Sequence, residues 1–268
     1  MGEGHAIVLG IPDLAVAALL VAVPGLISFA LSLGLEKRLL WASVRTVAQL
    51  MLIGFVLGWV FGLEAAAAVV GLGLIMTWVA GRAAVERSSR FFKGIHHRAY
   101  ASLVVSAFVT TAMVTAVIVG VDPWYEARYV IPILGMVLGN SLTGLSLCVD
   151  TLLEAFSERR REVEMELALG ATKWEAARPA LREAVRRGMI PIINSMMVVG
   201  LVSLPGMMTG QIIEGADPMN AVRYQIVVMF MIAASTSIAC ILMTLLVYRR
   251  LFNARHQLLS HLIKKRLN

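Results

Sequence analysis

Long apolar runs separated by short loops constrain this chain more than any other feature of its sequence. Each run approaches the 20 or so mostly apolar residues that a helix needs to cross a bilayer. A mean hydropathy of +0.79 and a charged fraction of only 15% are both outside the usual range of soluble domains. We therefore expect an all-α, polytopic integral membrane protein forming one transmembrane domain over residues 1–268. Its predicted spans, about seven in number, are residues 11–34, 45–63, 65–81, 99–121, 129–149, 188–213 and 224–248.

Two of these runs need comment. The first resembles a signal peptide in its position, but acidic Glu3 and Asp13 stand where a basic leader is usual. We expect it to be a retained span. The second and third runs are separated only by residues 62–64, which predicts a tight helical hairpin.

The basic residues predict the orientation of the spans. If alternate loops are assigned to opposite sides, only Arg128 and Arg223 of the 24 Lys and Arg residues fall on the minority side. Lys and Arg are enriched in cytoplasmic loops. The N-terminus is therefore expected outside and the C-terminus in the cytoplasm. Because the net charge of +7 is spread between apolar runs, it indicates membrane orientation, and we expect no nucleic-acid partner.

The longest basic loop, residues 150–187, is the predicted cytoplasmic insert. Helix-favouring residues run from Asp150 to Leu169, and Gly170 then suits the left-handed position that follows a helix. Thr172 with Glu175 three residues later predicts a capping box that starts a second, short helix, which Arg178–Pro179 should kink or end. The result would be a protruding elbow. Its proposed coupling residues are Leu169, Gly170, Ala171, Thr172, Trp174 and Glu175.

Two interpretations of the elbow remain open. Its apolar ridge, formed by Leu167, Leu169, Ala171, Trp174 and Ala177, could pack against the chain's own helices. Alternatively, it could dock in the groove of a partner protein.

Several classes of function lack the residues they need. The sequence contains no G-x-x-x-x-G-K-[ST] phosphate-binding loop. No ionisable residue falls near the middle of a predicted span, as a proton-driven carrier would require, and the five histidines lie outside the spans. We therefore expect no catalytic site and no cofactor bound by this chain. Energy for active transport would have to arrive through the insert.

Four stretches carry a resemblance to a known family. They are LALGATKWEAA (167–177), VIPILGMVLGNSLTGLSL (130–147), VVGLVSLPGMMTGQIIEGADPMNAVRYQIVVMFMI (198–232) and RRLFNARHQL (249–258). The first resembles the coupling segment of ABC-transporter permeases. Together they are similar to the FetB-type iron-export permeases of bacteria and to the related plant aluminium-tolerance permeases. The resemblance extends from Leu35 onward, and residues 1–34 match only in being apolar.

The resemblance implies a permease subunit in the bacterial inner (plasma) membrane that pairs with a separate cytoplasmic ATPase of the FetA type. That partner would bind ATP and Mg. The cargo would be iron or a related metal, exported in metal homeostasis and in resistance to oxidative stress. Because ABC motors close as two-site sandwiches and each chain offers one elbow, a homodimer is expected.

Polar and sulfur-containing residues within the fifth and sixth spans are candidates for the transport path, because polar groups at membrane depth face a bundle interior or a watery path. Interhelical hydrogen bonding is the alternative for Asn140 and Asn194. Pro205–Gly206 should break the sixth helix in its outer third. The path candidates are Asn140, Ser141, Thr143, Asn194, Ser195, Met196, Met197, Ser203, Pro205, Gly206, Met207, Met208 and Gln211.

The candidate ligands for a metal ion are Glu36, Asn140, Asp150, Asn194, Met207 and Met208. Thioethers favour soft ions such as Cu(I), whereas Fe(II) prefers nitrogen and oxygen ligands, so the paired methionines could equally be packing residues. Glu36 and Asp150 could collect a cation at the inner side, or could pair with Lys37 and Arg159. Two rival functions stay open: an ABC permease for a lipid or sugar nucleotide, and a non-transporting membrane scaffold or receptor.

Overall fold

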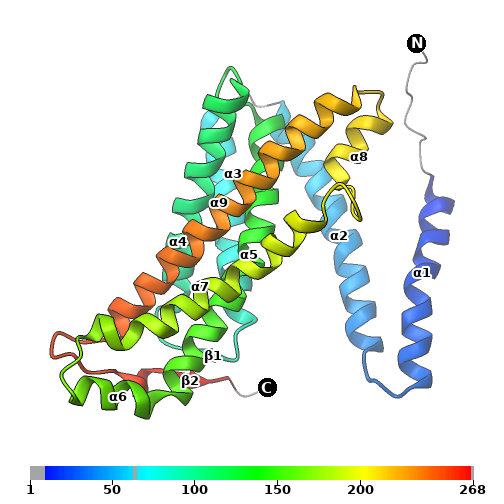
Figure 1. Cartoon of the computed structure of the whole chain (residues 1–268). Coiled ribbons are helices and arrows are strands. Elements are labelled where there is room, and N and C mark those ends of the chain that lie inside the picture. The colour runs from blue at the N-terminus through cyan, green and yellow to red at the C-terminus, as the bar shows by residue number, and fades with distance from the viewer. Residues whose placement is uncertain (1–9, 63–64, 267–268) are drawn as a thin grey trace.

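The computed structural model describes residues 10–62 and 65–266, and this part of the chain is almost wholly helical. Figure 1 shows the arrangement. The long helices are α1 (Ile11–Ala30), α2 (Glu36–Phe61), α3 (Ala66–Glu86), α4 (Ile95–Ala112) with a π-helical continuation (Met113–Val119), α5 (Ala127–Glu158), α7 (Lys173–Val198) and α9 (Pro218–Leu251). Shorter elements are α6 (Arg160–Ala168), α8 (Gly206–Ile213), a 3-10 turn (Ser260–Leu262) and the strands β1 (Arg90–Phe91) and β2 (Lys264–Lys265).

Six helices in the described residues are long and apolar enough to cross a membrane: α1, α2, α3, α4 with its continuation, α5 and α9. This confirms a polytopic, all-helical membrane protein. Helices α5 and α9 begin before and end after their predicted spans, and α2 begins nine residues before its span. Hydropathy marks only the apolar part of such a helix, whose polar ends remain helical in water.

The sixth predicted span, 188–213, is divided between two helices, and the break expected at Pro205–Gly206 begins earlier, after Val198. Helix α7 ends at Val198, the chain turns through residues 199–205, and α8 begins at Gly206. Gly200 adopts a φ of +83°, and its N–H donates to the carbonyl of Ser203 at 2.9 Å. Pro205 then restricts the residue before it and lacks an N–H, as predicted for a break at this position. Helices α7 and α8 together still run from one end of the bundle to the other (Figure 1).

The insert also differs from the prediction. The expected helix from Asp150 to Leu169 is divided at Arg159 between α5 and α6. Pro179 does not end the helix that follows, since α7 contains it and continues to Val198. Ala176, Ala177 and Leu181 are buried around this proline. Their packing outweighs the one backbone hydrogen bond that proline removes.

The core lies between α3, α4, α5, α7 and α9, and its tightest point is a crossing of glycines. A methyl group added to Gly188 would lie 2.7 Å from Cys240 Sγ and 2.9 Å from the carbonyl oxygen of Gly144. One added to Gly144 would lie 2.6 Å from the carbonyl oxygen of Gly188. Small residues allow helix backbones this close in membrane bundles. Gly144 thus allows α5 to pack closely on α7, whereas a methyl group added to Gly139 would have no neighbour within 4 Å.

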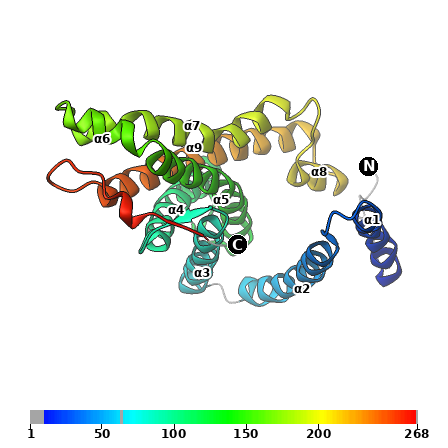
Figure 2. The same ribbon diagram turned by 90° about the horizontal axis from the view of Figure 1, so that it is seen from below.

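Helices α1 and α2 stand away from this core (Figure 2). Ser28 accepts the backbone N–H of Leu35 and donates to Glu36 Oε1 at 2.7 Å, which fixes the turn between them. Only the last turns of α2 meet α3 and α5, through Val60, Val69 and Ile131. The expected tight hairpin is therefore open. Side chains such as Phe55 are exposed in the apolar part of α2, residues 50–61, and such a stretch needs no protein partner in lipid.

The basic loops gather at one end of the molecule. The α1–α2 and α3–α4 connections, α6, the start of α7 and the chain after α9 all lie at the lower end in Figure 1, which we call the elbow end. The α8–α9 connection lies at the opposite end. Successive loops thus alternate between the two ends, with the basic loops at the elbow end, and this is the pattern from which the orientation was predicted.

Candidate coupling elbow and transport path

The elbow (Leu169–Glu175) is built by two complementary helix caps. Gly170 has a φ of +97°, which glycine adopts at little cost. Its N–H donates to the carbonyl of Leu167, and the Ala171 N–H donates to the carbonyl of Glu166 at 3.0 Å. These two bonds form a Schellman motif that ends α6.

The capping box predicted at the start of α7 is present. The Glu175 N–H donates to Thr172 Oγ1 at 3.3 Å, and the Thr172 N–H donates to Glu175 Oε2 at 2.8 Å. The Thr172 hydroxyl also donates to that carboxylate oxygen, at 2.7 Å. These donors lower the pKa of Glu175 below its ordinary value. The carboxylate is therefore ionised at neutral pH, and the cap weakens only as the pH falls through that lowered pKa.

The apolar ridge of the elbow divides into buried and exposed parts. Ala177 is fully buried and Leu167 packs against the core, as the first interpretation expected. Leu169 is 82% exposed at the tip. The indole of Trp174 is about half exposed and lies edge-on against Tyr248 of α9, with ring centroids 5.6 Å apart. The elbow is therefore anchored by its sides and presents an apolar tip.

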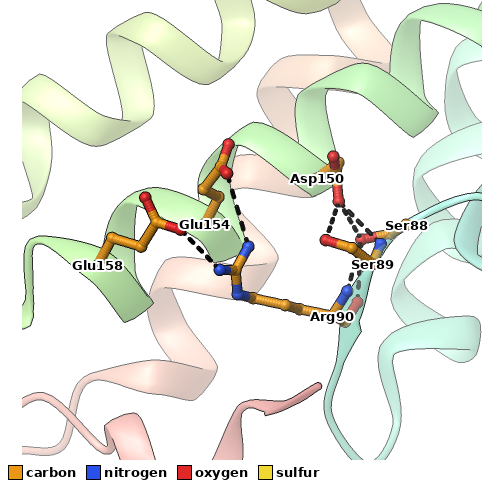
Figure 3. A network of polar contacts seen from close by, with 6 residues as sticks. All are labelled: Ser88, Ser89, Arg90, Asp150, Glu154 and Glu158. Carbon is orange, nitrogen blue, oxygen red and sulfur yellow. Dashed lines mark hydrogen bonds and ion pairs between the residues drawn. The ribbon is translucent and has the colours of Figure 1, made fainter. Parts of the chain in front are cut away.

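A polar network fastens the α3–α4 connection to α5 at the elbow end (Figure 3). Asp150 Oδ1 accepts from the Ser89 N–H and hydroxyl, both at 2.8 Å, and from the Ser88 hydroxyl at 3.1 Å. Arg90 forms ion pairs with Glu158 at 2.9 Å and Glu154 at 3.8 Å. Asp150 therefore caps a turn of its own chain, and its predicted pairing with Arg159 is not among the ion pairs of the described residues.

The path candidates on α5 lie on two different faces. Asn140 and Thr143 are exposed, and each bonds a carbonyl one turn earlier in its own helix. Ser141 is fully buried, and its hydroxyl donates to Ser235 of α9 at 3.2 Å. Ser141 therefore contributes to the α5–α9 packing, and its place on the transport path stays a prediction. The interhelical hydrogen bond considered for Asn140 is found at Ser141 instead.

On α7, Asn194, Ser195 and Met197 are exposed, whereas Met196 packs partly against the core. Ser203 is exposed in the break, and Pro205 and Gly206 form the start of α8. Met207 packs against the core and Met208 is half-buried. Gln211 on α8 has its side-chain oxygen buried with no hydrogen-bond partner among the described residues.

The metal candidates are distributed over four helices: Glu36 on α2, Asn140 and Asp150 on α5, Asn194 on α7, and Met207 and Met208 on α8. Glu36 bonds Ser28 rather than Lys37. Within the described part of the chain, no three His, Cys, Asp or Glu side chains gather in a way that could hold a metal ion.

Two features of the elbow end were missed at the level of sequence. The network of Arg90 and Asp150 joins residues about 60 positions apart, and the Lys173 N–H bonds His256, 83 positions away. Neither has a local spacing that would reveal it. The only available signal was the motif RRLFNARHQL (249–258), to which no role was assigned.

Comparison with known proteins supplies the family. The chain is 36% identical to the probable iron export permease protein FetB of Escherichia coli, over 95% of this chain and 96% of that protein. It is 40% identical to a UPF0014 membrane protein of Synechocystis, over 85% of this chain and 88% of the other. Protein ALUMINUM SENSITIVE 3 of Arabidopsis thaliana is 34% identical, over 93% and 89% of the two chains. No solved structure matches.

The profile of the family described as "Uncharacterised protein family (UPF0014)" matches residues 11–252, which include every long helix. This multi-pass membrane protein therefore belongs to the UPF0014 family.

Proposed function

We propose that the chain is the permease subunit of an ABC transporter, driven at its elbow by a separate ATPase subunit. One observation carries this proposal: a doubly capped elbow holds an exposed leucine away from the bundle, in a chain whose sequence has no phosphate-binding loop. A rigid apolar tip can enter a groove of a partner and transmit its movement. ATP and Mg belong, in this proposal, to the partner.

The proposed orientation places the elbow end in the cytoplasm of a bacterium and the N-terminus outside the inner membrane. Every basic loop lies at the elbow end, where the positive-inside rule puts the cytoplasm. A cytoplasmic ATPase could then reach the elbow.

A second copy of the chain completes the proposed transporter. Asn140 and Thr143 on α5, and Asn194 and Ser195 on α7, are exposed within the apolar stretches 130–149 and 188–198 of these helices. Exposed polar side chains at membrane depth are disfavoured by lipid, and they face protein or water instead. Two such faces opposed across a dimer would enclose a path lined with amide and hydroxyl groups.

The proposed cargo is iron or a related metal, and the support is the printed name of the relative from Escherichia coli. Amide and hydroxyl oxygens on the exposed faces suit a hard or borderline cation that must bind weakly and leave. Met197 is 72% exposed beside them, while Met196 and Met207 contact the core. A role in iron homeostasis and in resistance to oxidative stress would follow from this cargo.

Reconstitution tests this function. The full chain and a FetA-type ATPase subunit from the same organism would be placed in proteoliposomes. ATP hydrolysis would be recorded with Fe²⁺, Mn²⁺, Zn²⁺ and Cu⁺ in turn, and liposomes holding the ATPase alone would be the control.

We expect Fe²⁺ to stimulate hydrolysis and to move across the membrane only when both subunits and ATP are present. Stimulation by a lipid or a sugar nucleotide, and by none of the cations, would overturn the metal cargo. An ATPase that neither binds nor responds to the chain would overturn the permease assignment itself and favour a scaffold.

A further inference from the structure

The segment after α9 forms a compact turn, Asn253–Gln257, which lies within the motif RRLFNARHQL. The Asn253 side-chain oxygen accepts the N–H groups of Arg255 at 2.9 Å and Gln257 at 3.0 Å. Its amide nitrogen donates to the Gln257 side-chain oxygen at 2.8 Å, and its own N–H donates to the Gln257 carbonyl. Four hydrogen bonds are thus formed within five residues. Such a turn holds a defined shape although residues 254–257 are exposed.

The turn presents His256 in an unusual backbone conformation. His256 has a φ of +55°, in the left-handed region that only a few per cent of residues other than glycine adopt. Such strain persists only where the surroundings enforce it, and it is concentrated at functional sites. In this conformation His256 Nδ1 accepts the backbone N–H of Lys173 at 3.0 Å.

The Lys173 N–H is one of the donors that an α-helix leaves without a partner of its own. Lys173 is the first residue of α7, and the first four N–H groups of a helix have no intrahelical acceptor. Thr172 satisfies the N–H of Glu175, and His256 satisfies that of Lys173. The turn therefore completes the cap of α7 from outside the elbow.

Aromatic contacts connect the start of α7 to the helix bundle. Trp174 meets Tyr248, Tyr248 meets Phe252 at 5.4 Å, and Phe252 meets Phe156 of α5 at 5.5 Å between ring centroids. Phe252 and Phe156 are buried. The first and last of these pairs are edge-to-face, and the middle pair is tilted at 42°. Aromatic pairs have preferred geometries, so we expect a displaced Trp174 to displace Tyr248 and Phe252. The elbow is thereby connected to the ends of both α9 and α5.

We propose that the Asn253–Gln257 turn is the second half of the coupling surface, and that His256 is a positioning residue that sets the direction of the elbow. The inference rests on the proposed function, because its partner is the ATPase subunit. In this proposal, Leu169 contacts the ATPase subunit, and the His256–Lys173 bond fixes the angle at which α7 leaves the elbow. The aromatic contacts transmit the movement of the elbow to α9 and α5. The bond requires a neutral imidazole whose proton is on Nε2.

The chain offers two matched pairs of variants. His256→Asn keeps an acceptor atom at the δ position and tolerates a positive φ, whereas His256→Ala removes the acceptor. Asn253→Asp keeps the oxygen that accepts both N–H groups of the turn, whereas Asn253→Ala removes it. Both pairs test the His256–Lys173 bond: the first changes its acceptor, and the second changes the turn that holds His256 in place.

The first measurement is hydrogen exchange of the full chain in nanodiscs, without any ATPase. In His256→Ala we expect the Lys173 amide to exchange about tenfold faster than in the wild type, because its acceptor is lost. Asn253→Ala should show the same change. His256→Asn and Asn253→Asp should stay within about twofold of the wild type.

The second measurement is the affinity of the same nanodiscs for a FetA-type ATPase subunit. Loss of one hydrogen bond predicts about fivefold weaker binding for His256→Ala and Asn253→Ala, with both conservative variants near the wild type. Wild-type affinity in His256→Ala, or equal loss in His256→Asn, would overturn the positioning role. If His256→Ala does not fold, the Asn253 pair decides alone by the same criteria.

Leu169→Glu separates this inference from the proposed function. If Leu169→Glu abolishes ATPase binding while His256→Ala and Asn253→Ala leave it unchanged, the positioning role fails and the elbow stands. If, instead, Leu169→Glu binds the ATPase subunit as tightly as the wild type does, the elbow is not the docking site, and both proposals fail.

Discussion

At the residue scale, the closest packing of the bundle depends on two glycines and two cysteines. Gly144 and Gly188 bring α5 and α7 together, and Cys148 and Cys240 fill the adjacent space without forming a disulfide. The Cys148 thiol lies 3.8 Å from the Cys240 carbonyl. There is no room for another methyl group at this crossing.

Gly188→Ala should therefore destabilise the bundle, because the new methyl group would overlap Cys240 and the Gly144 carbonyl. Overpacking of this kind costs about 1–3 kcal/mol. Gly139→Ala is the matched control, since open space surrounds that glycine. Thermal unfolding of the purified protein, followed by size-exclusion fluorescence, would measure both. Equal stability of the two variants would contradict the packing described here.

The residue scale also shows what a sequence can reveal. The Thr172–Glu175 cap and the left-handed Gly170 depend on spacings of three residues or fewer, and both were predicted correctly. The contact of Ser141 with Ser235, 94 positions away, was not predicted, because nothing in the neighbouring sequence indicates it. Contacts between residues a few positions apart can be predicted from the sequence, whereas the partner of a buried polar group depends on how the helices pack.

At the scale of elements, helix existence was more predictable than helix ends. The apolar runs located the long helices, but Pro179 failed to stop α7 because tertiary packing outweighed the local signal. Conversely, Gly200 and Pro205 opened a gap within an apolar run that hydropathy had treated as continuous. Local breakers therefore act only where packing does not oppose them.

The α3–α4 connection is the element whose position depends most on charge. Arg90 is 14% exposed and bridges two carboxylates of α5, whereas Arg82 and Glu86 form an exposed pair within α3. The strand pair β1–β2 and the backbone bond from Arg266 to Ser89 join the C-terminal segment to the same connection.

We expect Arg90→Ala to loosen this connection, at a cost of about 1–2 kcal/mol reduced by the partial exposure of both glutamates. Arg82→Ala should cost less than about 0.5 kcal/mol. Hydrogen exchange of residues 88–91 would report the difference. Unchanged protection in Arg90→Ala would show that the ion pairs do not hold the connection.

At the scale of the whole molecule, the proposed orientation depends on the segregation of the basic loops at the elbow end. With Cys148 and Cys240 buried, introduced cysteines can be labelled selectively. A membrane-impermeant maleimide should label Leu169→Cys only after cells are permeabilised. Glu214→Cys, at the opposite end, should be labelled in intact cells. The reverse pattern would invert the proposed orientation.

The exposed polar face of α5 makes a separate prediction about assembly. Thr143→Cys should form a cross-linked dimer when oxidised in membranes, because two α5 faces are proposed to oppose each other. Ser141→Cys is the matched control, since that position is buried against α9. Monomer alone from Thr143→Cys would argue for a different dimer surface.

The proposed transporter depends on force entering at the elbow. The most direct measurement is ATP-dependent Fe²⁺ transport by reconstituted permease and ATPase, comparing the wild type with the double variant Gly170→Ala, Trp174→Ala. Thr172→Ser, which keeps the cap, is the control. We predict that the double variant reaches the membrane at the wild-type level and transports no iron, while the control transports normally. Full transport by the double variant would contradict the account.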